Sequence, residues 1–183
     1  GFTGVLARTL EEVSWLKEEK IELPFALDAS VYACNREAVH TLKEMGPEFI
    51  TMPWELNSRE LKAVAKACER DGIPVIYGHA PMMVSAQCVV KTLKGCTAKR
   101  EHLIMKDRTG AGLPLKAHCN FCYNTILNPL PLSLFGNEEA VRELNMASLR
   151  LSFTREGKEE TQKILEAFAA SFIEGREIVE PVK

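Results

Sequence analysis

The chain has 183 residues, 46% of them hydrophobic and 26% charged, and a formal net charge of −2 at pH 7. This length can bury the core of one domain, and the charge balance excludes the strongly basic surface of many nucleic-acid-binding modules. No apolar run reaches the ~18 residues of a membrane span, and no secretory pattern opens the chain, so we expect a cytoplasmic protein. In that reducing compartment the six cysteines are expected to be thiols or metal ligands rather than disulfides.

The first half of the chain alternates short apolar runs with amphipathic segments. Strands are predicted at residues 4–7, 25–28, 49–52 and 75–77. Helices are predicted between them, beginning after Thr9, where Glu12 has the capping-box spacing, near Arg36, and after Asn57. This alternation predicts a parallel sheet with crossover helices.

The alternation breaks between residues 79 and 128, where glycines, prolines and four cysteines accumulate. Segments 101–106 and 113–117 favour a hairpin with Gly110 in its turn. Strands are predicted again at 130–135 and 148–153, together with a short helix capped by Asn137 and a long helix over 158–172. We therefore divide the chain into first βα units, a cysteine-rich insertion, last βα units and a tail, at residues 1–78, 79–128, 129–175 and 176–183.

The expected fold class is α/β, a partial TIM-barrel-like (β/α) repeat with a cysteine-rich loop and hairpin insertion. Without the insertion roughly 135 residues remain, too few for a complete (β/α)₈ barrel of ~250 residues. Because the chain opens with Gly1 and an apolar Phe2 that leads into a strand, we expect a piece of a longer protein. The open strand edges of such a piece are compatible with a homo-oligomer.

Four cysteines lie in the predicted insertion: Cys88, Cys96, Cys119 and Cys122. Thiolates gathered by a loop-rich segment are typical of a metal site or an iron–sulfur cluster. A single CxxC pair favours a cluster over zinc, because a zinc ribbon normally has two such pairs. Zinc stays open as an alternative, as do four buried thiols that simply fill an irregular region. His118 is a candidate substitute ligand.

Three side chains lie at or just after the ends of predicted parallel strands, where barrel enzymes place functional groups: Asp28, Glu55 and His79. They are the acid–base candidates for catalysis, although helix capping or loop hydrogen bonding explains such residues equally well. The sequence lacks the GxSxG, HExxH, GxGxxG and P-loop motifs, which argues against a conventional serine or zinc protease, a nucleotide hydrolase and a dinucleotide enzyme.

An ordered series of motifs covers much of the chain, at residues 53–57, 77–88, 95–96, 103–108, 119–124, 126–128 and 131–134. In this order the motifs resemble the peptidase U32, or collagenase-like protease, family. The resemblance implies the C-terminal part of a TIM-barrel-like domain, with the remaining N-terminal part of the protein as its partner. Cys88 and Cys96 match a first cysteine pair of the family, and Cys119 or Cys122 the next position.

The resemblance also implies an enzyme. Members take part in hydroxylation of RNA or of ubiquinone precursors, and some hold a 4Fe–4S cluster through four cysteines. We therefore expect cluster-supported hydroxylation of an RNA base or a related substrate. The alternatives are a peptide-bond hydrolase, as the family name states, and a structural zinc module that binds RNA or protein.

Overall fold

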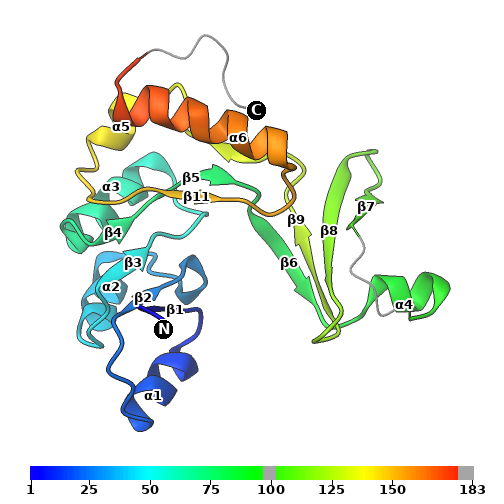
Figure 1. Ribbon diagram of the computed structural model, residues 1–183, viewed down its shortest axis with the longest axis horizontal. Helices are drawn as coiled ribbons and strands as arrows, with labels where there is room; N and C mark the ends of the chain where they lie inside the picture. Colours follow the sequence, from blue (N-terminus) through cyan, green and yellow to red (C-terminus); the bar gives the residue numbers. More distant parts are fainter. Residues whose placement is uncertain (97–101, 177–183) are drawn as a thin grey trace.

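The structure is a computed structural model that describes residues 1–96 and 102–176 (Figure 1). In this part of the chain one sheet is parallel, one is mixed and one is antiparallel. One sheet contains, in this order, β1 (Val5–Ala7), β2 (Phe25–Leu27), β3 (Phe49–Thr51) and β4 (Gly72–Ile73). The next strand, β5 (Val75–Gly78), pairs in parallel with β11 (Arg150–Ser152) and antiparallel with β10 (Leu132–Ser133). The predicted parallel sheet is confirmed. Strand β4 was not predicted, because two residues before Pro74 are too few for a period-2 pattern.

Helices follow the strands much as the sequence predicts. They are α1 (Leu10–Glu18), α2 (Arg36–Lys43), α3 (Ser58–Cys68), α5 (Glu138–Arg142) and α6 (Lys158–Phe168). The capping boxes at Thr9 and Asn57 are both present. Asn137 is the N-cap of α5, as predicted, but its side chain makes no capping hydrogen bond. The predicted last helix changes at Ala169 into a π-helical turn that ends at Ile173.

An antiparallel sheet projects to one side of the parallel strands (Figure 1). Its strands, in spatial order, are β6 (Pro81–Ser85), β9 (Tyr123–Leu127), β8 (Gly112–His118) and β7 (His102–Lys106). With helix α4 (Val89–Lys94) it makes up what we call the arm, residues 81–96 and 102–127. Strands β7 and β8 confirm the predicted hairpin, apart from residue 101, which lies outside the described residues. The predicted tail also lies outside them, except for Arg176.

The turn of this hairpin is built on one carboxylate. Asp107 Oδ1 accepts hydrogen bonds from the backbone N–H of Thr109 at 2.8 Å and of Ala111 at 2.9 Å. These bonds and the positive φ of Gly110 explain why the hairpin turns at the position predicted from the sequence.

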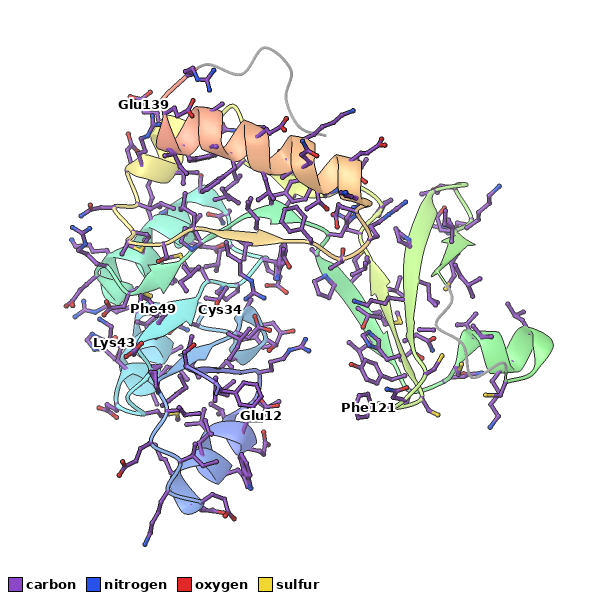
Figure 2. All side chains as sticks on the ribbon, viewed as in Figure 1. Glu12, Cys34, Lys43, Phe49, Phe121 and Glu139 are labelled. Atoms are coloured by element: carbon purple, nitrogen blue, oxygen red, sulfur yellow. The ribbon has the colours of Figure 1, made fainter. Side chains whose placement is uncertain are left out.

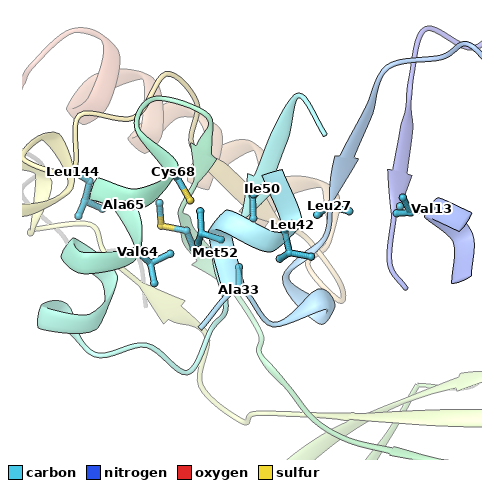
Figure 3. Packing of buried hydrophobic residues seen from close by; sticks show 12 residues of the cluster. Val13, Leu27, Ala33, Leu42, Ile50, Met52, Val64, Ala65, Cys68 and Leu144 are labelled. Carbon is cyan, nitrogen blue, oxygen red and sulfur yellow. The ribbon is translucent and has the colours of Figure 1, made fainter. Parts of the chain in front are cut away.

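Three separate apolar clusters stabilise the described parts. The first joins the parallel sheet to its helices, with Ile50, Met52, Val64 and Cys68 at its centre (Figure 3). The arm has its own cluster around Leu115, and a third surrounds Tyr77 beneath α6. Among the described helices, none is long and apolar enough to cross a membrane.

Candidate functional site

A cavity of about 280 Å³ lies at the carboxyl ends of the parallel strands, against the arm; we call it the rim cavity. All three candidate catalytic residues, Asp28, Glu55 and His79, line it. Asp28 follows β2 and His79 follows β5, while Glu55 lies in the loop after β3. The rim cavity is lined as well by Arg8, Trp54 and Arg150 from the parallel strands and their loops. The arm contributes Lys116, His118 and Thr125. The cavity therefore lies where strand-end residues of an α/β sheet commonly meet a ligand.

Asp28 is held by two cations. Its Oδ2 accepts from Arg8 Nε at 3.1 Å, and its Oδ1 accepts from Arg150 Nη1 at 2.5 Å and from the backbone N–H of Ala29 at 2.9 Å. Only 10% of the Asp28 side chain is exposed. These contacts make Asp28 an anchor for two guanidinium groups rather than a base open to a substrate.

His79 has one hydrogen-bond acceptor and one nearby carboxylate. Because a carbonyl oxygen only accepts, the 2.8 Å contact of Nδ1 with Asn128 O places a proton on Nδ1. Nε2 lies 3.8 Å from Oε1 of Glu156, whose side chain is fully buried. The same Oε1 accepts from the Tyr77 hydroxyl at 3.3 Å. An imidazole between a carbonyl and a carboxylate is well placed to hold or pass a proton.

Glu156 is an anion inside the protein. Burial acts to raise its pKa, but its own backbone N–H, the N–H groups of Thr154 and Arg155 at 2.6 and 2.9 Å from Oε2, and His79 together hold the pKa below its ordinary value. Burial, followed by the charge of Glu156, raises the pKa of Tyr77, so this hydroxyl keeps its proton. Glu156 thus accepts a hydrogen bond from Tyr77 and lies close to His79, which lines the rim cavity.

A second cavity, of about 270 Å³, is lined by all four cysteines of the arm: Cys88, Cys96, Cys119 and Cys122. We call it the cysteine cavity. Cys88 and Cys96 flank helix α4, and the other two lie in the loop between β8 and β9. Phe121 marks that loop at the far end of the arm (Figure 2). Cys88 and Cys119 are half-buried, while Cys96 and Cys122 are exposed.

The backbone conformation is distinctive at two of these cysteines, Cys88 and Cys122. Cys88 is the N-cap of α4, and its Sγ accepts from the Lys91 N–H at 3.5 Å. Cys122 has a φ of 55°, an uncommon conformation for a residue other than glycine. Within residues 1–96 and 102–176, no group of three or more His, Cys, Asp or Glu side chains is arranged to hold a single metal ion.

His118 lines both cavities. Its Nε2 is 3.2 Å from Thr125 Oγ1, and its ring stacks on Tyr123 with centroids 4.2 Å apart. His118 is therefore shared by the linings of the two cavities.

The sequence model of peptidase family U32 matches residues 3–107, more than half of the chain. The chain belongs to peptidase family U32. The match covers the candidate residues Asp28, Glu55 and His79 as well as Cys88 and Cys96, and it ends before Cys119. Comparisons with curated proteins and with solved structures found no match.

Three residues of this U32 domain were missed from sequence: Arg8, Arg150 and Glu156. Arg8 directly follows β1, so the strand-end signal that selected Asp28 also selects it. The other two carry no local signal. Arg150 opens a strand and contacts Asp28 across 122 positions, and Glu156 meets Tyr77 across 79.

Proposed function

We propose that this U32 domain binds a 4Fe–4S cluster through Cys88, Cys96, Cys119 and Cys122, and that it supports hydroxylation of an RNA base or a related substrate held in the rim cavity. The cluster, when bound, supplies one-electron redox chemistry that side chains lack. One observation carries the proposal: four cysteines from two chain segments line one cavity, which shares His118 with a second cavity lined by several charged side chains.

The residues of the cysteine cavity suit such a group. Its volume of about 270 Å³ is far larger than the ~30 Å³ share of one water molecule, so it can take a group larger than a single ion. Iron–sulfur clusters recruit cysteines from separate loops, and N–H groups directed at the sulfurs tune them, as the Lys91 N–H does at Cys88. The exposed Cys96 and Cys122 lie at loop positions that can adjust as the cluster assembles.

We also propose that the fold is a partial TIM-barrel-like domain in which residues 79–128 are an insertion. Parallel strands β1 to β4 follow one another in chain order. Pro74, which has no N–H to donate, separates β4 from β5, and β5 continues the parallel pairing to β11. Barrel enzymes bind substrates at the carboxyl ends of their strands, where the rim cavity lies.

In this scheme the rim cavity provides proton handling. His79 presents an imidazole that is hydrogen-bonded to Asn128 and faces Glu156, and Glu55 offers an exposed carboxylate. Asp28 orients Arg8 and Arg150. These side chains bind and orient the substrate and accept or return its protons.

Anaerobic purification of the full-length protein tests the cluster. We expect a brown protein that absorbs near 400 nm and contains about four iron and four sulfide per chain. Replacing any of the four cysteines with serine should remove most of the iron. Cys34→Ser is the matched control, since Cys34 is exposed and lies outside the cavity, and it should keep the iron. Stoichiometric zinc in a colourless protein would support the zinc module instead, and protein with neither metal would refute both.

Peptide-bond hydrolysis is the second candidate function. The family name and the His79–Glu156 pair beside the rim cavity favour it. Turnover of gelatin or peptides that is lost in Glu55→Gln and His79→Asn, but kept in Cys96→Ser, would establish this activity. If neither wild-type protein nor any variant cleaves peptides, this candidate fails.

A further inference from the structure

Two guanidinium groups in the rim cavity remain without a role in proton transfer. Arg8 and Arg150 come from opposite ends of the chain, and both contact the carboxylate of Asp28. One carboxylate thus faces two positive charges, which leaves an excess of one positive charge at this point of the cavity.

Most hydrogen-bond donors of these two groups are unused. A guanidinium has five N–H donors in a planar fork. Among the described residues, Arg8 donates only through Nε, and Arg150 only through Nη1, to Asp28 and at 3.4 Å to Thr51. The remaining donors belong to side chains that line the cavity, where they can meet a ligand.

The rest of the lining favours an anion as well. Of the described charged residues that line the rim cavity, Arg8, Lys116 and Arg150 are cationic, whereas Asp28 and Glu55 are carboxylates. Since Asp28 is already bound by two arginines, Glu55 is the one carboxylate in this part of the lining without a described ion pair. Counted over these lining residues, the balance of charge is positive on the Arg8–Arg150 side.

We propose that Arg8 and Arg150 bind an oxyanion of the substrate, either a phosphate or a carboxylate group. The proposal rests on the rim cavity being the substrate site of the proposed function. Guanidinium forks match the planar or tetrahedral arrangement of such oxygens and bind them through paired N–H donors.

Asp28 prepares this site before the ligand arrives. With 10% of its side chain exposed, it fixes one nitrogen of each arginine and so restricts the directions of the others. A positioned donor loses less side-chain freedom on binding than a mobile one, which strengthens the contact. Asp28 is thus a positioning residue that acts through the arginines.

Binding can be measured directly on the guanidinium groups. Inorganic phosphate and malonate are titrated separately into ¹⁵N-labelled protein at constant ionic strength, and the Nε–H resonances of arginine are followed by NMR. We use NMR because phosphate stabilises most proteins through exclusion from their surface, which a melting experiment would not separate from binding. We expect saturable shifts of the Arg8 and Arg150 signals. The anion that binds with the lower Kd, phosphate or malonate, shows whether the site prefers a phosphate or a carboxylate group.

Three variants decide the assignment. Arg8→Gln should weaken binding about tenfold or more, because it removes charge-assisted hydrogen bonds from a side chain that is 63% exposed and contributes little to folding. Arg150→Lys keeps the charge next to Asp28 but loses the fork, and should weaken binding without unfolding the protein. Arg70→Gln, an exposed arginine outside the cavity, should bind like wild type.

Two results would overturn the proposal. One is the absence of saturable shifts with both probes; the other is equal binding by wild type, Arg8→Gln and Arg150→Lys. Iron and sulfide are measured on the same samples. Oxyanion binding in protein that never takes up a cluster would refute the proposed function alone, and cluster-loaded protein without oxyanion binding would refute this inference alone.

Discussion

At the scale of single residues, the buried carboxylate of Glu156 is the most consequential group. It has no exposed side-chain surface, yet it accepts two backbone N–H groups and the Tyr77 hydroxyl and faces His79. Burying an anion is costly unless hydrogen bonds replace the lost water. Its partners provide that replacement, so the charge is part of the folded structure.

Glu156 should therefore make stability depend on acid. Because folding lowers its pKa, its contribution is fully present above the ordinary pKa of a glutamate, ~4.3, and is lost as pH falls through the lower pKa of the folded state. We expect Glu156→Gln to cost about 1–3 kcal/mol at pH 7 and to flatten the fall in stability below pH ~4. Urea unfolding between pH 3 and 7 measures both. Glu44→Gln, at an exposed position, should behave like wild type, and an unchanged pH profile in Glu156→Gln would contradict this account.

The two cysteines outside the arm should differ sharply in reactivity. Burial raises the pKa of the Cys68 thiol to about 11, and the side chain lies inside the first apolar cluster. Because the thiolate is the reactive form, we expect iodoacetamide at pH 8 to leave Cys68 unlabelled in folded protein and to label it in urea. Cys34 is the internal reference: partial burial, followed by the charges of Glu55 and Glu60, raises its pKa as well, but its side chain is exposed to the reagent. Mass spectrometry of the peptides reads the result. Equal labelling of both thiols in the folded protein would show that the core opens.

At the scale of elements, Gly78 at the end of β5 lets this strand pack closely against β11 and Trp54. A Cβ added at Gly78 would lie 2.5 Å from Ser152 O in β11 and 3.1 Å from Trp54, and its φ is +144°. The missing side chain lets β5 and β11 approach closely beside the rim cavity. The backbone oxygen cannot move aside without disturbing the strand pairing.

Gly78→Ala should consequently destabilise the protein by about 3 kcal/mol or more, through the clash and the backbone strain together. Gly136→Ala is the control, because Gly136 also has a positive φ, +87°, but no atom within 4 Å of an added Cβ. It should cost only about 1 kcal/mol, from strain alone. Thermal or urea unfolding of both variants gives the difference, and equal costs would mean that close packing at β5 contributes nothing.

Elements with local signals were predictable, and those defined by distant contacts were not. The capping boxes at Thr9 and Asn57 fix helix starts within four residues of sequence, so the pattern alone reveals them. Helix α4 has six residues, too few to display a helical period. Strand β10 was predicted at 130–135 but spans two residues, since its extent depends on pairing with β5.

At the scale of the whole molecule, the arm has its own apolar cluster. Leu115 and Val90 pack there, away from the cluster that includes Ile50. Two clusters that do not merge can open separately. The cysteine cavity is therefore supported mainly by the packing of the arm itself.

Leu115→Ala and Ile50→Ala should separate these two units. Each removes a fully buried side chain and should cost about 2–5 kcal/mol locally. We expect Leu115→Ala to accelerate amide hydrogen exchange in residues 102–127 and to leave β1 to β3 largely protected. Ile50→Ala should have the reverse pattern. Uniform acceleration in both variants would show that the arm and the parallel sheet unfold as one unit.

The candidate site was partly predictable at this scale. Asp28, Glu55 and His79 were found because parallel strands end at one edge, so residues after different strands converge there. The convergence of the four cysteines on one cavity was expected from their clustering in sequence. The contacts of Arg150 with Asp28 and of Glu156 with His79 join distant segments, and no spacing rule reports such pairs.

The sulfur of Cys88 links the inorganic chemistry proposed here to the folding of a helix. It accepts the Lys91 N–H that opens α4, a helix too short to be stable on its own hydrogen bonds. A thiolate bound to iron accepts that N–H more strongly than a neutral thiol does. Iron uptake should therefore stabilise α4, and iron-free protein should be cut by trypsin after Lys91 far sooner than loaded protein.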